Sequence, residues 1–195
     1  MKNYNFFAML SRMKYINRWG LMRNTKTENL SEHSLEVAQI AHALAIINKK
    51  RFSGNANPQY VALVAMYHDT SEIITGDLPT PIKYYNAEIK QAYKQIEATA
   101  EKELIDMLPE DFKEDFYSIY NPDELTTKLV KAADKISALI KCTEEMNMGN
   151  REFKVAKEIT EKAIKDMNCK EADVFIEEFL PSFLLSLDEQ KNKMQ

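Results

Sequence analysis

The sequence predicts an all-α fold, and two observations support that prediction. Apolar residues recur every three or four positions along most of the chain, which is the period of an amphipathic helix, whereas the alternation of a strand is hard to find. Glycine is rare, with 4 in 195 residues, so few points interrupt the regular pattern. The length suits one domain with a sizeable core, and the expected connections are short. We therefore expect a single compact helical domain over residues 1–195.

Three helices are expected in the first half of the chain. Gly20 breaks the first apolar pattern directly after Trp19. Pro58 is well placed to start the third helix, because the N–H that it lacks is not needed in a first turn. That helix is apolar almost all round, so we expect it to be buried on several sides. The expected helices run over about 5–17, from a cap at Asn29 or Ser31 to about Ile47, and over about 58–75.

The second half of the chain continues the helical pattern. Asp77-Leu78-Pro79-Thr80-Pro81 is expected to form a stiff loop, because two prolines fix its backbone. The segment 110–121 is less regular, and Asn121-Pro122-Asp123 then starts a helix that could reach Gly149. The remaining helices are expected over about 86–107, 151–167 and 171–187.

The charge distribution narrows the class of protein. A net charge of −4 argues against a general nucleic-acid binder, which would usually be basic. Residues 1–27, however, hold basic side chains and no acidic one. A targeting peptide would have this composition, although no cleavage site is evident, and the other interpretation is a local anion-attracting patch. The basic residues are Lys2, Arg12, Lys14, Arg18, Arg23 and Lys26.

Neither a membrane nor an oxidising compartment is indicated. No stretch approaches the ~20 apolar residues that a membrane span requires. Cys142 and Cys169 form no CxxC pair, and with no secretion signal they are most simply free thiols in a reducing compartment. We therefore expect a soluble, cytoplasmic protein.

His68 and Asp69 are adjacent within the most apolar of the expected helices. An ionisable pair is costly there unless something compensates for the lost solvation. One interpretation is a hydrogen-bonded core histidine beside a capping aspartate. The other interpretation is a functional site, and Glu72 favours it. At about 100° per residue, the side chains of His68, Asp69 and Glu72 fall within an arc of ~100° around the helix. Three polar groups on one face of an apolar helix are typical of a functional site.

Two further residues are candidates for the same site. His33 lies on the side that its helix buries, although alone it could equally be an ordinary polar residue of a first turn. His42 lies about 180° from His33 around that helix, so it cannot point into the same site. Asp134 has Val130 and Ala138 as same-face neighbours, which indicates a carboxylate at the edge of the core, although a surface charge is the simpler interpretation.

The order of these residues resembles the HD-domain phosphohydrolases, in which a histidine, an adjacent His-Asp pair and a distant aspartate each lie on a helix. Beyond that motif, the chain looks like the bacterial 5′-deoxynucleotidase branch from Phe6 to about Asp188, and the segment 110–123 is the least similar part. The matching segments are Asn17-Arg18-Trp19, Thr27-Glu28-Asn29-Leu30-Ser31-Glu32-His33-Ser34, Ala65-Met66-Tyr67-His68-Asp69, Glu72, Thr75-Gly76-Asp77-Leu78-Pro79-Thr80-Pro81, Lys131-Ala132-Ala133-Asp134 and Pro181-Ser182-Phe183.

The resemblance implies an HD-domain fold, a homodimer and specific roles for these residues. Substrates in similar enzymes are 2′-deoxyribonucleoside 5′-monophosphates with several bases accepted, not nucleic-acid polymers. Glu72, Arg18 and Asp77 would be catalytic. The implied ligands of one divalent metal ion are His33, His68, Asp69 and Asp134. The implied substrate-binding residues are Arg18, Trp19, His33, Asp69, Asp77, Leu78, Pro79, Thr80 and Asp134.

These residue types suit that chemistry. Two imidazoles and two carboxylates make a neutral site around a dication, and mixed N/O ligands suit Co, Mn, Fe or Zn. An octahedral ion with four protein ligands keeps positions for a water and a phosphate oxygen, so it can activate the water and neutralise the phosphate. Glu72 could then orient or deprotonate the water, and Arg18 offers a planar charged fork for the phosphate. Asp77 could protonate the leaving alcohol only if its pKa is raised.

Trp19 is the single tryptophan of the chain. It could be a core anchor, but its position between Arg18 and Gly20 favours the wall of a substrate pocket. A rigid indole against C2′ of the sugar would leave neither room nor a partner for a 2′-hydroxyl, so ribose would be excluded.

Two other functions stay open on the sequence. One is a different HD hydrolase, such as a phosphodiesterase or a triphosphate-cleaving enzyme. The other is a non-enzymatic module in which a degenerate HD site senses a nucleotide. The presence of Glu72 together with every implied metal ligand argues against a degenerate site.

Overall fold

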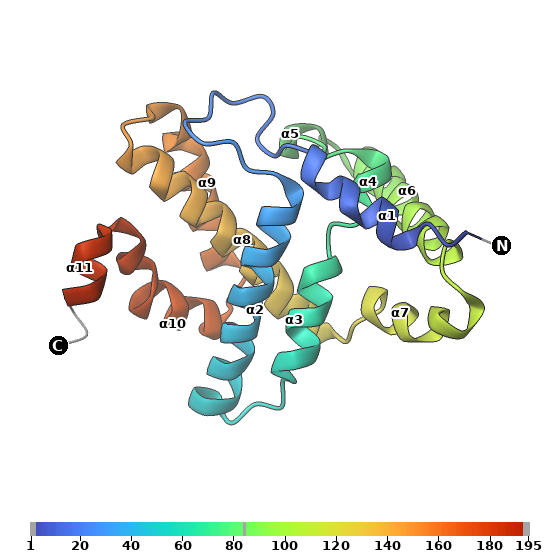
Figure 1. The fold of residues 1–195 in the computed structure, drawn as a ribbon. Helices are drawn as coiled ribbons and strands as arrows, with labels where there is room; N and C mark the ends of the chain where they lie inside the picture. Colours follow the sequence, from blue (N-terminus) through green and yellow to red (C-terminus); the bar gives the residue numbers. More distant parts are fainter. Residues whose placement is uncertain (1–2, 84, 193–195) are drawn as a thin grey trace.

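Helices form nearly all the regular structure of the computed structural model, which describes residues 3–83 and 85–192 (Figure 1). The all-α prediction is confirmed, and in the described residues the only strand-like pairing is an isolated bridge between Asn17 and Asn29. The α-helices and the short 3-10 turns, labelled η, are α1 (Phe6–Leu10), η1 (Ser11–Tyr15), α2 (Leu30–Phe52), α3 (Pro58–Tyr67), α4 (Glu72–Thr75), α5 (Thr80–Lys83), α6 (Ala87–Asp106), η2 (Glu110–Phe112), α7 (Lys113–Tyr120), α8 (Glu124–Asn147), η3 (Arg151–Phe153), α9 (Lys154–Asp166), α10 (Lys170–Glu178), η4 (Leu180–Leu184) and α11 (Leu187–Asn192).

The core lies where α2, α3 and α8 pack against one another, near the centre of Figure 1. Helix α2 contributes Val37, Ala41 and Leu44, which recur at helical spacing and are fully buried. Helix α8 contributes Leu129 and Ile136 in the same way. Helix α9 packs on α8, and α10 packs on α2. The core therefore joins the helices that carry His33 and Asp134, α2 and α8, to α3, which ends directly before His68 and Asp69.

Side-chain caps fix where the main helices begin. The Asn29 side chain accepts hydrogen bonds from the N–H groups of Ser31 and Glu32, and Glu32 bonds back to the Asn29 N–H, which completes a capping box. Asn29 is therefore the cap of α2. Pro58 occupies the first turn of α3, as predicted, and Asp123 caps α8.

Helix α2 extends to Phe52, five residues past the predicted end near Ile47. Its last turn holds Lys49, Lys50 and Arg51, and positive charge there favours the C-terminal end of a helix. Ser53, with a left-handed φ of 52°, ends the helix. The following glycine is required by close packing, because a Cβ on Gly54 would lie 2.0 Å from Oδ1 of Asn48.

The predicted continuous helix over 58–75 is wrong, because α3 ends at Tyr67 and α4 begins only at Glu72. Polar side chains take up the carbonyl groups at the end of α3. The Nδ1 atom of His68 lies 2.7 Å from the carbonyl oxygen of Ala65, and the hydroxyl of Thr70 donates to the carbonyl of Tyr67 at 2.9 Å. The same carbonyl groups also accept from the backbone N–H groups of His68 and Thr70, three residues on, so the regular bonding to the fourth residue stops here. His68 and Asp69 therefore lie in a tight turn at the helix end.

One face of α3 is also less covered than predicted. Leu63 and Met66, one turn apart, are 39% and 46% exposed, whereas Val61, Val64 and Ala65 on the other side are buried. The helix packs on α2, α7 and α8. Its opposite face stays open because no described helix packs there.

Three other element predictions need correction. The first helix divides into α1 and η1 and ends at Tyr15. The segment 110–121 is mostly helical, and its helix α7 is held by Phe116, which packs against Phe6 and Tyr67 from remote parts of the chain. The last predicted helix ends at Glu178, because Pro181 cannot continue it and a 3-10 turn follows. No described helix is both long and apolar enough to cross a membrane.

Candidate metal centre

The predicted metal ligands come from three separate helical segments. His33 lies in the first turns of α2 and is 1% exposed. His68 and Asp69 lie in the turn after α3, with side chains 13% and 18% exposed, and Asp134 lies in α8 with a side chain 25% exposed. The cluster therefore has a sealed inner side at His33 and a half-open outer side at Asp134.

These side chains converge. The Nε2 atom of His33 lies 3.3 Å from Oδ1 of Asp134 and 3.5 Å from Oδ2 of Asp69. The Nε2 atom of His68 lies 3.1 Å from Oδ2 of Asp69. One ligand atom each from His33, His68 and Asp134 can be chosen so that all lie within 4.8 Å of one another. His33, His68 and Asp134 are therefore close enough together to share a single ion, and Oδ2 of Asp69 lies beside both histidines.

Hydrogen bonds on the far side of each imidazole leave its Nε2 atom available. The Ser137 hydroxyl donates to the Glu36 carboxylate at 2.6 Å, so its oxygen accepts from Nδ1–H of His33 at 3.1 Å. A carbonyl oxygen only accepts, so Nδ1–H of His68 donates to Ala65. Both Nε2 atoms are buried and make no hydrogen bond with any described residue. Unpartnered imidazole nitrogens facing carboxylates are what a divalent cation requires.

The charges around His33 favour a cation at this point. Burial lowers the pKa of His33, but the nearby carboxylates of Asp134, Asp69 and Glu28 outweigh burial and raise it to about 10. The pKa values of Asp69 and Asp134 are lowered despite burial, chiefly by the imidazoles, so both carboxyl groups stay ionised. A proton on His33 and a metal ion therefore compete for one electronegative position.

Arg18 lies at the edge of this cluster. Its Nη1 atom is 3.4 Å from Oδ2 of Asp69, and its Nη2 atom is 3.9 Å from Oδ1 of Asp134. Its Nε atom donates to Glu28 at 3.0 Å, and the same Glu28 oxygen lies 3.4 Å from Nδ1 of His33. Glu28 thus joins the predicted phosphate-binding arginine to a predicted metal ligand.

Glu72 begins α4 and is buried beside the cluster. Burial raises the pKa of Glu72 to about 9, with further contributions from the negative charges of Asp69 and Asp77. Burial also raises the pKa of Asp77, which is the condition that a proton donor at this position must meet. Both acidic groups therefore hold a proton more readily than an exposed carboxyl group does.

The other predicted substrate residues lie in the loop before α5, at the start of α5 and in the segment after η1. Leu78 and Pro79 are half-buried in the loop before α5, and Thr80 begins α5, with a side chain that lies outside the described part of the structure. Trp19 is half-buried, and its indole packs on Phe153, with the ring centroids 5.4 Å apart. Its Nε1 atom has no hydrogen-bond partner among the described residues.

Three residues that contact the cluster were not predicted as functional from the sequence. Glu28 could have been noticed as the first acidic residue after the basic stretch 1–27. Glu36 and Ser137 each follow a predicted ligand by three residues, His33 and Asp134 respectively, so each lies about one helical turn away. The sequence alone could not show that the two bond to each other.

A comparison of the whole chain with protein families gives one clear result. A family model described as 5′-deoxynucleotidase YfbR-like matches residues 5–183. A curated 5′-deoxynucleotidase from Erwinia tasmaniensis is 53% identical over 192 residues, which cover 97% of each chain.

Solved structures share the fold at lower sequence identity. An HD-domain phosphohydrolase from Listeria innocua superposes with a TM-score of 0.80 at 23% identity and covers 96% of this chain and 92% of its own. An HD phosphohydrolase from cyanophage S-2L, described as bound to dA and one catalytic zinc ion, superposes with a TM-score of 0.67 at 19% identity. The match covers 90% of this chain and 96% of the phage protein. The HD-domain fold is therefore confirmed.

Proposed function

Because the chain belongs to the YfbR-like 5′-deoxynucleotidase family, a family of hydrolases, we propose that it hydrolyses 2′-deoxyribonucleoside 5′-monophosphates to deoxynucleoside and phosphate at the centre formed by His33, His68, Asp69 and Asp134. The observation that supports this most directly is the pair of buried, unpartnered Nε2 atoms facing two ionised carboxyl groups. We propose that the whole chain, residues 1–195, is one such domain.

The centre would hold one divalent ion, with cobalt, manganese or zinc favoured by its mixed nitrogen and oxygen donors. Zinc is the ion named for the cyanophage protein of the same fold. When bound, the ion supplies positive charge that neutralises the phosphate and lowers the pKa of the attacking water.

Arg18 binds the phosphate. In the structure its guanidinium faces the carboxylates of Asp69 and Asp134, and a phosphate oxygen offers the same planar fork a stronger acceptor. The Glu28 carboxylate accepts a hydrogen bond from Nε of Arg18, on the side of the guanidinium away from the cluster. The two Nη atoms therefore stay directed toward Asp69 and Asp134. This arrangement would orient the phosphorus atom for an in-line attack by water.

Glu72 and Asp77 move the protons. Glu72 takes a proton from water as the water oxygen bonds to phosphorus, and this role requires its ionised form. A divalent cation held beside Glu72 would lower its raised pKa, adding to the smaller opposing effect of Arg18 and Lys83. As the bond from phosphorus to O5′ breaks, Asp77 donates a proton to the departing oxygen. The raised pKa of Asp77 supports the donor role.

Trp19 excludes ribonucleotides. Its indole packs on Phe153, a fully buried side chain, and this contact opposes the movement that would admit a 2′-hydroxyl. The cost of an added hydroxyl is then a steric clash together with an unpaired polar group. If Trp19→Ala leaves the ratio of deoxy to ribo catalytic efficiency unchanged, this role is wrong.

We also propose a cytoplasmic homodimer that acts on free nucleotides. The exposed apolar side chains Leu63 and Met66, one turn apart on α3, support a protein contact on that face. Size-exclusion chromatography with light scattering would test the dimer. A monomer at micromolar concentration would contradict it.

The function is tested by phosphate release from paired deoxy- and ribonucleoside 5′-monophosphates. Chelated protein should be inactive, and Co, Mn or Zn added back should restore release from the deoxy substrates. Glu72→Ala should lower kcat by at least about 100-fold. Wild-type turnover in that variant would remove Glu72 from the mechanism. Release of pyrophosphate or triphosphate from longer nucleotides, or cleavage of a diester, would instead indicate a different HD hydrolase.

A further inference from the structure

A buried ion pair that includes no predicted metal ligand lies near the end of α8. Lys141 and Glu145, one turn apart, are 6% and 1% exposed. Charges this deeply buried destabilise a fold unless other groups complete their hydrogen bonds. Those groups come from the segment 23–26, which follows Arg18 and Trp19 in the chain.

The hydrogen bonds run from both charges to that segment. The carboxylate of Glu145 accepts from the Thr25 N–H at 2.9 Å and from the Thr25 hydroxyl at 2.7 Å. The ammonium group of Lys141 donates to the carbonyl oxygen of Lys26. Although burial raises the pKa of Glu145, hydrogen bonds from Lys141, Asn150 and Thr25 hold it well below its usual range. The carboxylate therefore stays charged at neutral pH.

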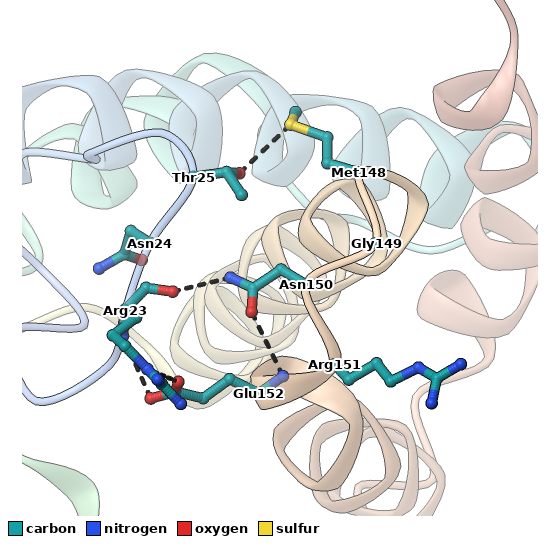
Figure 2. Close-up of a pocket in the computed structure, with 8 residues that line it drawn as sticks. All are labelled: Arg23, Asn24, Thr25, Met148, Gly149, Asn150, Arg151 and Glu152. Carbon is teal, nitrogen blue, oxygen red and sulfur yellow. Dashed lines mark hydrogen bonds and ion pairs between the residues drawn. The ribbon is translucent and has the colours of Figure 1, made fainter.

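Asn150 extends the same network. Its Nδ2 atom donates to Glu145 and to the carbonyl oxygen of Arg23, each at 2.7 Å, and Figure 2 shows the second of these bonds across the gap between the two segments. The Arg23 guanidinium pairs with Glu152 beside it. We call Lys141, Glu145 and Asn150 the loop clamp. The clamp lies beside an open hollow of about 700 Å³, lined by residues 23–25 and 148–152.

The segment held by the loop clamp is also fixed at its base. The Arg18 N–H donates to the Glu28 carbonyl at 2.9 Å, and the Leu30 N–H donates to the Ile16 carbonyl at 2.9 Å. Residues 18–28 therefore form a loop closed at its base by the bridge and held near its middle by the clamp. Arg18 and Trp19 lie between these two attachments.

Trp19 needs such support because its backbone is strained. Its φ of 58° is a left-handed conformation that bulky residues rarely adopt, and it persists only where the surroundings enforce it. The Trp19 carbonyl accepts from the Met22 N–H at 2.9 Å and from the Asn24 side chain at 3.2 Å. The ammonium group of Lys141 lies 5.6 Å from the centre of the Phe153 ring on which the indole packs.

We propose that the loop clamp positions Trp19 and Arg18, and that Glu145 is in this way a specificity-determining residue although it lies outside the substrate site. The kinetic part of this inference rests on the proposed function. Loss of the clamp releases the middle of the loop, so the indole no longer occupies one position against the sugar. The selection between deoxyribose and ribose weakens, whereas the metal ligands, which are held by the core of α2, α3 and α8, keep their geometry.

The test uses Glu145→Gln, with Glu158→Gln as the matched control. Glu158 lies on the exposed side of α9, so its substitution removes the same charge and leaves the loop intact. Trp19 is the only tryptophan, so intrinsic fluorescence reports the loop directly, with no substrate or metal present. In Glu145→Gln we expect stronger quenching by acrylamide, emission at longer wavelength and unchanged metal affinity. Glu158→Gln should match the wild type in each measurement.

Enzyme kinetics of the same variants distinguish a misplaced Trp19 from a general loss of activity. Glu145→Gln should raise KM for a deoxynucleoside monophosphate and lower the deoxy-to-ribo ratio of kcat/KM by about tenfold, with a smaller change in kcat. Equal loss for both sugars, or unchanged fluorescence in a folded Glu145→Gln protein, would overturn the proposal. If the wild type released no phosphate, the proposed function would fail, and the fluorescence arm would still decide whether the clamp holds Trp19.

A second variant covers the case in which Glu145→Gln does not fold. Thr25→Val removes the hydroxyl that bonds to Glu145 and to Sδ of Met148, and it leaves the buried ion pair in place. It should change the acrylamide quenching of Trp19 and the deoxy-to-ribo ratio of kcat/KM in the same directions as Glu145→Gln does, but by smaller factors. Wild-type values in Thr25→Val, with Glu145→Gln unfolded, would overturn the proposal.

Discussion

His33 is the residue that links the buried core to the metal centre. Its Nδ1 side bonds to Ser137, which bonds to Glu36, and its Nε2 side faces Asp69 and Asp134. The first set of contacts fixes the ring orientation and the position of its hydrogen, and the second defines the ligand position. A substitution on the Nδ1 side should therefore change metal binding without touching a ligand.

Ser137→Ala is the direct test of this linkage. The alanine removes the acceptor for Nδ1–H of His33, so we expect metal affinity to fall by about 10-fold, measured by calorimetric titration. Ser118→Ala is the control, because among the described residues that hydroxyl bonds to the carbonyl of Asp115 on α7, remote from His33 in the chain. Equal metal affinity in the two variants would mean that Ser137 does not orient His33.

The raised pKa of Glu72 predicts how the stability of metal-free protein depends on pH. Between the usual pKa of a glutamic acid, about 4.3, and the folded value, Glu72 is protonated in the folded chain and ionised in the unfolded one. The folded state thus binds more protons than the unfolded state, so stability falls as pH rises through that interval. This is the opposite of the behaviour of a carboxyl group whose pKa is lowered by folding.

Glu72→Gln removes that dependence. We measure the free energy of unfolding by urea with chelator present. Relative to the wild type, that of the variant should rise by at most about 1.4 kcal/mol per pH unit between about pH 6 and pH 8. Subtracting the two proteins cancels the other titrating groups. A constant difference over this interval would show that Glu72 has an ordinary pKa in the folded protein.

At the scale of the element, the start of α2 couples helix stability to the metal centre. The capping box at Asn29 fixes the first turn, and His33 lies directly after it. Helix α6 offers a matched element, since Asn86 caps it through the Ile89 N–H and lies on a different part of the fold. The two caps are chemically alike, but only the α2 cap precedes a predicted metal ligand.

Asn29→Ala and Asn86→Ala should each lower the free energy of unfolding by about 1 kcal/mol. Only Asn29→Ala should also weaken metal binding, because fraying of the first turn of α2 displaces His33. Urea unfolding and metal titration of both variants measure the two effects. Equal metal affinity in the two variants would show that the α2 cap does not contribute to the centre.

The elements also show what the sequence could and could not predict. Long periodic segments and their caps were predictable, as at Pro58 and Asp123, because local side chains decide them. The end of α3 was not, because His68 and Thr70 bond to carbonyl groups of their own turn and interrupt an apolar pattern that otherwise continues. Helix α7 was missed because Phe116 is held by aromatic rings from distant segments.

At the scale of the molecule, the family resemblance predicted which residues would bind the metal ion. The spacing of those residues along the sequence could not predict this. The sequence placed Arg18, His33, His68 and Asp134 on separate segments with no indication of distance. Their convergence depends on the packing of α2, α3 and α8, which is a long-range property. The loop clamp was invisible for the same reason, since Thr25 and Glu145 are 120 residues apart.

A centre that joins three helical segments should stabilise the whole molecule when it binds its ion. At a free metal concentration about 100 times Kd, we expect a gain of about 2.7 kcal/mol in the free energy of unfolding. Asp134→Ala, which removes the ligand from α8, should abolish most of that gain. Thermal unfolding with chelator and with each metal measures this increase in the free energy of unfolding. An equal increase in Asp134→Ala and the wild type would place the ion elsewhere.

The most direct test of the account is anomalous diffraction from crystals grown with cobalt or zinc. We predict one strong anomalous peak per chain, about 2.0–2.2 Å from Nε2 of His33, Nε2 of His68 and an oxygen each of Asp69 and Asp134. A peak that omits His33 or Asp134, or a peak at another cluster with these four side chains unbound, would contradict the account.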